Sequence, residues 1–223
     1  MTEKMTLKAA RAATGDIGFP SKMPGTSYGI PAQACITGGK LAQIPGSVCY
    51  GCYALKGNYL YPSVQIAQSR RLAAINDPLW VKGMVNIINH AQRTGKGRNG
   101  PIAKGYHRWH DSGDTQSEKH IGKICEVARL TPKVKHWLPT RELAMLLRFI
   151  ANGGVVPPNL TIRVSATMID GPATTKWEHT SGVHYAAMPP KDQICPAPTQ
   201  DGRCGPCRKC WDKSVPHVSY HKH

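Results

Sequence analysis

Acidic residues are scarce in this chain of 223 residues, which carries 13 Asp and Glu against 29 Lys and Arg. The shortage is uneven: Asp77 is the only carboxylate between Asp16 and Asp111, a stretch that holds many Lys and Arg residues. The net charge of +16 produces a field of one sign, and such a field attracts polyanions. The composition therefore indicates DNA or RNA as a partner, with general basicity of the surface as the plain alternative.

The chain also lacks any run of eighteen apolar residues, and its N-terminus shows no charged-then-apolar signal. A membrane span needs about 20 predominantly apolar residues, and a secretory signal needs an apolar core after its charges. We therefore expect no membrane association and a cytoplasmic protein. With 40% hydrophobic residues, the chain can still bury a core.

Cysteine, in contrast, is abundant, and seven of the eight cysteines fall into two groups. The C-terminal group has the spacing C-x8-C-x2-C-x2-C and consists of Cys195, Cys204, Cys207 and Cys210. Two residues between thiols let one tight turn direct both sulfurs at a single metal centre. In a chain without an export signal, this spacing indicates metal binding rather than disulfides.

Cationic side chains flank the C-terminal thiols. Arg203, Arg208 and Lys209 are their sequence neighbours, and we expect these charges to lower the cysteine pKa values and favour the thiolate form. Both a tetrahedral zinc site and a four-thiolate iron–sulfur cluster fit four thiolates. We favour iron–sulfur of the 4Fe-4S type, because three of the thiols fall within seven residues, as in ferredoxin-type runs.

The N-terminal group consists of Cys35, Cys49 and Cys52, with thirteen residues between the first two. Three thiolates leave one coordination position for another protein ligand, a substrate or a cofactor. The simplest scheme is therefore two clusters, one on each group. The competing scheme is a single cluster that takes ligands from both groups.

Strand and helix patterns alternate through the middle of the chain. Helices are expected at 63–76 and 78–91, and strands at 102–109, 134–138, 160–167 and 183–187. A helix capped by Thr115 follows the first of these strands, and a helix capped by Thr140 follows the second. The first of these two helices places Cys125 on its core face. Such alternation is typical of a parallel sheet with helices packed on it.

The expected fold class is therefore α/β, a partial (β/α) barrel-like parallel sheet with irregular cysteine-rich N- and C-terminal segments. We expect one domain, 1–223, composed of an N-terminal cysteine loop (1–62), a β/α region (63–190) and a C-terminal cysteine cluster (191–223). Because the two cysteine groups flank the β/α region, we expect them to meet at the same rim of the sheet.

Polar residues follow three of the expected strands: the segments 110–114, 140–142 and 165–167. Ligands of parallel sheets bind at the carboxyl ends of the strands, so these segments predict a shared pocket, with ordinary helix capping as the alternative. For contact with nucleic acid, the candidates are the cations of the acid-poor half: Arg70, Arg71, Arg93, Lys96, Arg98, Lys104 and Arg108.

Several strings stand out over nearly the whole chain: the segment 21–25, Cys35, the segment 46–54, the segment 109–114 and the closing run from Cys195 to Trp211. Together they resemble the bacteriophage "gene product eighty-eight" domain family. This resemblance implies a bacteriophage protein in the cytoplasm of the infected bacterial host. It implies little about activity.

The piece Cys49-x2-Cys52-Tyr-Ala is also similar to the cluster-binding loop of radical S-adenosylmethionine enzymes. That resemblance implies a partial barrel whose three-cysteine loop leaves one iron open to the cofactor. Ser112, Gly113 and Asp114 are loosely similar to the motif that contacts the amino group of the cofactor. The spacing differs, because that family has C-x3-C-x2-C.

Three hypotheses about function remain open. The first is a phage iron–sulfur protein that binds nucleic acid or acts in redox regulation, which we favour on the sequence. The second is an enzyme like the radical S-adenosylmethionine proteins, acting on a nucleotide or nucleic acid. The third is a structural zinc protein. A simple electron carrier fits less well, since such a carrier has no need for a charge of +16.

Overall fold

The structure, a computed structural model, describes residues 5–97, 100–185 and 190–222. Its centre is a six-stranded sheet in which every neighbouring pair of strands is parallel. In spatial order the strands are β1 (Thr26–Tyr28), β4 (Tyr106–Trp109), β5 (Lys135–Thr140), β6 (Leu160–Ser165), β7 (Thr180–His184) and β8 (His217–His221). The α/β class is thus confirmed. The sheet is open, with β1 and β8 at its edges.

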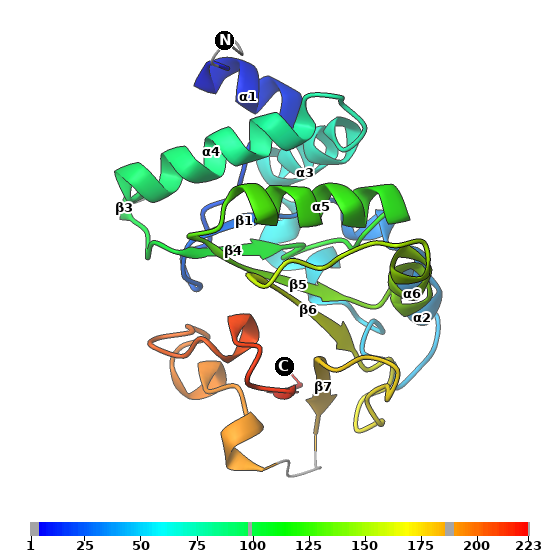
Figure 1. The fold of residues 1–223 in the computed structure, drawn as a ribbon. Coiled ribbons are helices and arrows are strands. Elements are labelled where there is room, and N and C mark those ends of the chain that lie inside the picture. The colour runs from blue at the N-terminus through cyan, green and yellow to red at the C-terminus, as the bar shows by residue number, and fades with distance from the viewer. Residues whose placement is uncertain (1–4, 98–99, 186–189, 223) are drawn as a thin grey trace.

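The helices are α1 (Leu7–Thr14), α2 (Ile36–Leu41), α3 (Pro62–Ala74), α4 (Trp80–Thr94), α5 (Glu118–Leu130) and α6 (Leu143–Ala151). Of these, α1, α3, α4 and α5 lie on one side of the sheet, and the orange-to-red C-terminal segment lies on the other (Figure 1). Parallel strands that follow one another in order, with crossovers of one hand, place their helices on one face. A small antiparallel hairpin, β2 (Lys96–Gly97) and β3 (Gly100–Pro101), extends from the end of α4.

Strand alternation divides the sheet into two unlike faces. On β6, Leu160, Ile162 and Val164 belong to the main hydrophobic core on the helix side. The intervening Arg163 points to the other side, where it is fully buried. Cys125 lies in the main core, as predicted.

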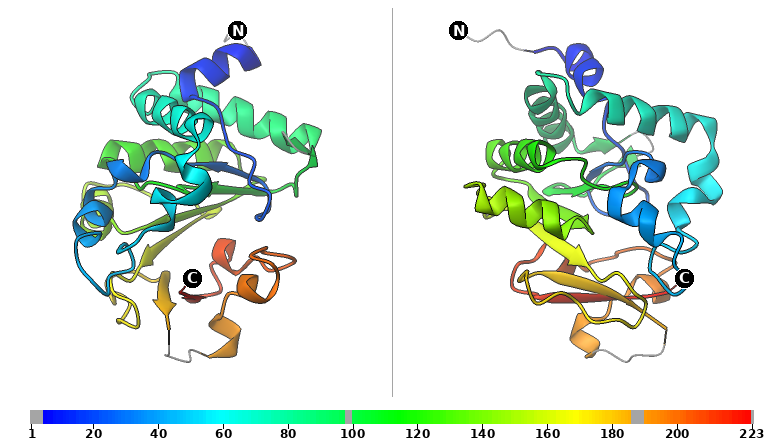
Figure 2. Two further views of the ribbon diagram at one scale, coloured as in Figure 1. Left: turned by 180° about the vertical axis from the view of Figure 1, so that it is seen from behind. Right: turned by 90° about the vertical axis from the view of Figure 1, so that its right-hand side faces the viewer.

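The helix-free face is covered by the C-terminal segment, as both views of Figure 2 show. Trp211 packs its ring against Trp137, with 5.0 Å between the ring centroids. The guanidinium of Arg163 donates hydrogen bonds to the backbone carbonyls of Lys209, Cys210, Asp212 and Val215 at 2.7–3.1 Å. A buried cation thus fixes residues 190–216, the part of the C-terminal segment before β8, whose regular structure consists of short 3₁₀ turns.

Several local expectations were wrong. Residues 7–14 form a helix where an irregular segment was expected, and β8 was not predicted. Ser117, rather than Thr115, caps α5 by accepting from the backbone N–H of His120. The last predicted strand, 183–187, overlaps β7, which ends at His184. Residues 186 and 187 of that prediction lie outside the described residues. These elements are short, so their sequences carry few periods of any pattern.

Four histidines are buried on the helix side of the sheet: His107, His110, His120 and His136. Burial lowers the pKa of each, to about 3 for His120 and His136. His136 accepts a hydrogen bond from the indole of Trp109 at 3.2 Å and lies 2.8 Å from the Thr131 hydroxyl. These rings are therefore neutral in the folded protein and protonated only after unfolding in mild acid.

Acid should destabilise the fold. Each buried histidine contributes stability that is fully present above its unfolded pKa of about 6.5 and is lost as the pH falls below it. Burial raises the pKa of Asp114 to about 6, so this carboxyl binds its proton more readily in the folded state. Its contribution has the opposite sign and cancels that of one of the four histidines. We expect the free energy of unfolding to fall by about 4 kcal/mol per pH unit between about 6 and 4.

Denaturant titrations across this pH range measure the slope. His136→Gln should make the slope shallower by about 1.4 kcal/mol per pH unit, which is the contribution of one proton. An unchanged slope in His136→Gln would show that this ring is protonated in the folded state as well.

Candidate metal centres

The N-terminal cysteines gather although thirteen residues separate the first two. Cys35 begins α2, which returns the chain toward Cys49. A Cβ placed on Gly38 of α2 would lie 3.4 Å from the sulfur of Cys49 and 3.6 Å from that of Cys35, so the two sulfurs lie within about 7 Å of each other. Cys52 also influences the pKa of both thiols through its charge, so it belongs to the same group.

This loop is attached to the carboxyl ends of the central strands. The backbone N–H and hydroxyl of Thr37 donate to the carboxylate of Glu142 at 2.7 and 2.8 Å. The N–H of Val48 donates to the carbonyl of Thr167, and the hydroxyl of Tyr53 donates to that of Asp111, both at 2.9 Å. The three thiols therefore lie beside the strand ends where polar residues were predicted to form a pocket.

Asp114 ties two strand ends together. Its carboxylate accepts hydrogen bonds from the N–H of Thr115, the hydroxyl of Thr140 and the N–H of Arg141, at 2.7–2.8 Å. Gly113 precedes it at φ +77°, and a Cβ there would lie 2.3 Å from the side chain of Ile30, so only glycine fits. Asp114 and Gly113 thus shape the site.

Several buried polar atoms at these strand ends have no hydrogen-bond partner among the described residues. They are the hydroxyl of Ser112, both ring nitrogens of His110, one carboxylate oxygen of Asp111 and Nε of Arg141. His110 also has φ +55°, an unusual value for a residue other than glycine. Buried polar groups are nearly always paired, so this concentration makes the strand ends the candidate site for a polar ligand.

The C-terminal cysteines form a second group beneath the helix-free face. The backbone N–H of Cys195 bonds Ser219 of β8 at 2.8 Å, that of Cys204 bonds Lys22 at 2.9 Å, and that of Cys207 closes a turn onto Cys204 at 3.0 Å. The sulfur of Cys210 lies 3.2 Å from the hydroxyl of Tyr220. The charge of Cys207 raises the pKa of Cys195, and the charge of Cys195 raises the pKa of Cys204 and Cys210, so all four thiols are neighbours.

The predicted lowering of the thiol pKa values was wrong. Burial raises the pKa of Cys195 and Cys204, and it raises that of Cys210 to about 12. In the N-terminal group, burial, followed by the nearby Asp114 charge, raises the pKa of Cys35 to about 12. Nearby cations lower these pKa values by less than burial raises them, so the metal-free thiols of Cys35, Cys195, Cys204 and Cys210 are protonated at neutral pH, and metal binding there would release protons.

That the two cysteine groups meet at one rim of the sheet stays a prediction. Arg108 adjoins the C-terminal group, where its charge opposes the rise in pKa that burial causes at Cys204 and Cys210. Its guanidinium lies 4.5 Å from the ring centroid of Trp137 and donates to the sulfur of Met23 at 3.0 Å. All eight cysteines are free thiols. Within the described residues, no three His, Cys, Asp or Glu side chains are arranged to hold a metal ion.

The cations predicted to contact nucleic acid divide into two sets. Arg70, Arg93, Lys96 and Lys104 are exposed, whereas Arg98 lies outside the described residues. Arg71 faces inward, with Nε donating to the carbonyl of Asp16 at 2.9 Å, and Arg108 is internal as described above. The two internal arginines are therefore unavailable to a partner on the surface.

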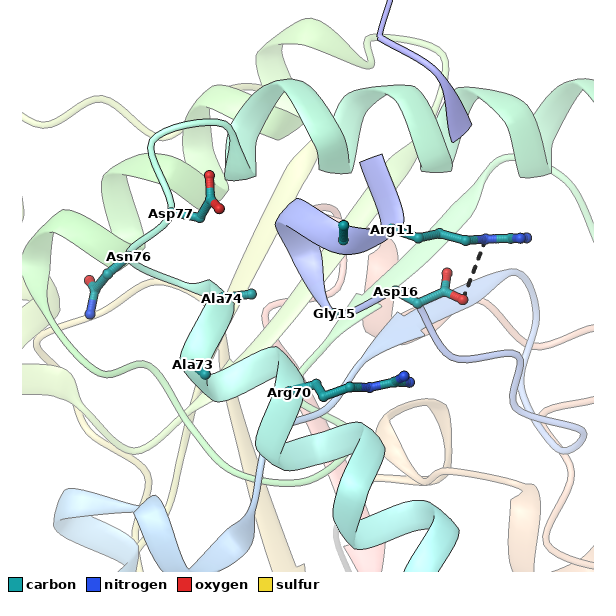
Figure 3. Close-up of a pocket in the computed structure, with 9 residues that line it drawn as sticks. Arg11, Gly15, Asp16, Arg70, Ala73, Ala74, Asn76 and Asp77 are labelled. Carbon is teal, nitrogen blue, oxygen red and sulfur yellow. Dashed lines mark ion pairs between the residues drawn. The ribbon is translucent and has the colours of Figure 1, made fainter. Parts of the chain in front are cut away.

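Arg70 lines a pocket between α1 and α3, shown in Figure 3. The same pocket contains Arg11, Asp16 and Asp77, and Arg11 pairs with Asp16 at 3.5 Å. Two arginines thus face two aspartates there. This mixed charge does not distinguish the pocket as a site for a polyanion.

The comparisons bear on family alone. No helix among the described residues is long and apolar enough to cross a membrane. No curated protein and no solved structure matches the chain significantly. The family model "Gene product 88" matches residues 2–213, nearly the whole length. The resemblance seen in the cysteine strings is thereby confirmed, and the chain belongs to the gene product 88 family.

Proposed function

We propose that this protein is a phage iron–sulfur enzyme of the host cytoplasm whose N-terminal cysteines hold a 4Fe-4S cluster with one iron open to S-adenosylmethionine. The observation that carries the proposal is the place of Cys35, Cys49 and Cys52. They follow β1 directly and gather, without a fourth thiol, at the carboxyl ends of a parallel sheet. The enzyme resembles the radical S-adenosylmethionine proteins in this arrangement.

The sheet supports the proposal. Six parallel strands follow one another in chain order, with helices on one face. This is how a partial (β/α) barrel is built, and in barrels of this kind the chemistry takes place at the carboxyl ends of the strands. In this proposal, the helix-free face of the sheet, which the C-terminal segment covers, corresponds to the interior of the partial barrel.

Helix α2 accounts for the unusual cysteine spacing. The thirteen residues between Cys35 and Cys49 are long enough to hold α2 and a return turn. Because Gly38 of α2 lies against both sulfurs, the two thiols are neighbours despite their distance in sequence. The departure from the C-x3-C-x2-C pattern therefore does not separate the ligands.

The unpartnered atoms at the strand ends fit a polar cofactor. The hydroxyl of Ser112 and the ring nitrogens of His110 are suited to bind the amino and carboxylate groups of an amino acid moiety. The carboxylate of Asp114 already accepts three hydrogen bonds, so its role is to position Arg141 and Thr140. Of the predicted cofactor residues, Ser112 is the one that binds directly.

Each component has a distinct task in this proposal. Cys35, Cys49 and Cys52 would hold the cluster, and the chemistry that it would supply when reduced is a one-electron transfer to the cofactor. Arg141, close to the thiols of Cys35 and Cys49, partly offsets the negative charge that thiolates and cluster bring together. The loop anchors, above all Thr37 on Glu142, hold the cysteines at the strand ends.

The C-terminal group holds a second cluster with four thiolate ligands, Cys195, Cys204, Cys207 and Cys210. Three of these thiols fall within seven residues, which favours iron–sulfur over zinc. The 3.2 Å contact between Cys210 and Tyr220 offers a hydrogen bond to a cluster thiolate. Such hydrogen bonds adjust the reduction potential of a cluster.

Iron analysis of cysteine variants tests the two-cluster scheme. Anaerobically purified protein should be brown, absorb broadly near roughly 400 nm and hold about eight irons, the content of two 4Fe-4S clusters. Replacing the cysteines of either group with Ala should remove about half of the iron. Cys125→Ala, in the core, is the matched control and should keep all of it. Loss of all iron from either group variant would favour the single cluster, and colourless protein with stoichiometric zinc would refute iron at both sites.

Cofactor cleavage tests the enzymatic part. With reductant, the protein should release methionine from S-adenosylmethionine, and the Cys35→Ala variant should release none. Ser112→Ala should keep its iron and bind the cofactor about tenfold more weakly, the effect of one lost hydrogen bond. Chromatography of the products and equilibrium binding measure these effects. Full iron content without reductant-dependent cleavage would leave an iron–sulfur protein that is no such enzyme.

A second candidate function, nucleic-acid binding, is supported by the distribution of surface charge. The hairpin β2–β3 and its flanks carry Arg93, Lys96 and Lys104, all exposed, and no carboxylate occurs between Asp77 and Asp111. Exposed cations gathered in this way are typical of contacts to phosphate. This function is compatible with the first, since the nucleic acid is a candidate substrate.

Anisotropy titrations with labelled single-stranded DNA and RNA test this candidate. Arg93→Ala with Lys96→Ala should weaken binding uniformly across sequences and reduce the salt slope by about 0.7 for each lost phosphate contact. Lys119→Ala with Lys133→Ala removes the same charge from other exposed positions and should change affinity less. No binding by the unaltered protein up to about 100 µM would end the nucleic-acid hypothesis.

A further inference from the structure

A cavity of about 460 Å³ lies between the hairpin β2–β3 and the C-terminal cysteine segment. One wall is formed by segments 19–24 and 203–208, and the other by Gly97 and residues 100–103. The size falls within the range of about 300–1,000 Å³ that is usual for small-ligand sites. Of the metal and cofactor ligands proposed above, Cys204 alone is among the residues that line this cavity.

Hydrogen bonds and close packing hold the walls in place. The N–H of Cys204 donates to the carbonyl of Lys22 at 2.9 Å, and the guanidinium of Arg203 donates to that of Ser21 at 3.3 Å. On the hairpin side, a Cβ on Gly97 would lie 3.1 Å from the ring of Phe19, so the hairpin packs closely against that residue. The cavity is therefore shaped by contacts between segments far apart in the chain.

The charge of the cavity has one sign. Its lining includes Lys22, Arg203 and Arg208 and no carboxylate. Among the described residues, none of the three forms an ion pair within 4.0 Å. Arg208 is held by stacking over Tyr106, 4.9 Å from the ring centroid, and by donating to the carbonyls of Gly205 and Cys207.

The lining also contains apolar side chains. They are Phe19, Met23 and Ile102, which are half-buried, together with Pro20, Pro24 and Pro101. Apolar and cationic side chains in one cavity match a ligand with a flat ring at one end and a phosphate at the other. A nucleotide has this chemistry, since the faces of its base stack on apolar side chains and its phosphate binds Lys and Arg.

We propose that this cavity binds one nucleotide unit of a single-stranded nucleic acid, with the phosphate on Lys22 and Arg203 and the base over Phe19. The inference deepens the nucleic-acid function proposed above by assigning a binding site to it. The strand continues past Lys96, which adjoins Gly97 of the cavity wall. A duplex is disfavoured, because its stacked bases do not enter a cavity of this size without being unpaired.

An acidic protein partner is the competing occupant of a cationic surface. Protein interfaces are typically broad, at about 800 Å² per partner, whereas the three cations here line a concave site. The apolar side chains of the lining also favour a ring system over carboxylate side chains. The observations therefore favour the nucleotide chain.

The test uses the full-length protein and a labelled single-stranded DNA or RNA of mixed sequence in anisotropy titrations. Lys22→Ala with Arg203→Ala should weaken binding at least about tenfold, since two charge-assisted hydrogen bonds are lost. The same variant should reduce the salt slope by about 1.4, which corresponds to two phosphate contacts on a single strand. Lys119→Ala with Lys133→Ala, the control of equal charge, should do neither.

Further measurements separate the possible failures. Lys22→Gln, which keeps most of the side-chain length, should give part of the loss, and thermal melts verify that each variant is folded. If the cavity variant and the control variant weaken nucleic-acid binding equally, the proposed site is wrong, and the binding comes from the overall positive charge of the surface. If neither variant affects binding, the site is also wrong although nucleic-acid binding stands. If the unaltered protein does not bind, both the site and the nucleic-acid function are wrong, while the iron and cleavage assays remain independent.

Discussion

The rest of this structure depends on the burial of a parallel sheet on both faces. Helices cover one face, but the other is covered by a segment with little regular structure, and that cover is held by the guanidinium of Arg163. A buried guanidinium is costly unless its donors are satisfied, and here several backbone carbonyls of residues 209–216 accept from it. The same bonds add to the backbone hydrogen bonds of an irregular segment, in which the carbonyls of Lys209 and Asp212 also accept from neighbouring N–H groups. One side chain on β6 thereby allows the C-terminal cysteines to lie directly on the sheet.

This arrangement gives the two cysteine groups different surroundings. The N-terminal group lies at the open end of the strands, beside atoms of Ser112, His110 and Arg141 that have no partner among the described residues. The C-terminal group is enclosed between the sheet and its own loop, where Tyr220 already contacts Cys210. A site with three thiols and unused polar atoms is suited to chemistry on a ligand. A site with four thiols can fill every ligand position of a cluster or an ion and is suited to holding it without exchange.

Much of the framework was predictable from the sequence, because β4, β5, β6, α5 and α6 have several periods of a regular pattern. The positions of the cysteine segments were not, since they depend on contacts between distant residues such as Thr37 with Glu142 and Arg163 with Asp212. Charge was also misleading. Arg71 and Arg108 have the same sequence character as exposed arginines, and only the fold shows that their guanidinium groups bind backbone, sulfur and aromatic rings inside the protein.

The high positive charge therefore has two roles that composition cannot separate. Internal arginines have a structural role. Arg163 donates to backbone carbonyls of the C-terminal segment, and Arg108 packs on the ring of Trp137 and donates to the sulfur of Met23. Other cations lie on the surface. Some of them pair with carboxylates, as Arg148 does with Glu118, and others lie along the hairpin and around the cavity beside Cys204. A charge of +16 would weaken a compact fold by self-repulsion if all of it were spread evenly over the surface. Because Arg163 and Arg108 bind acceptors inside the protein, only the cations on the surface are available to a partner.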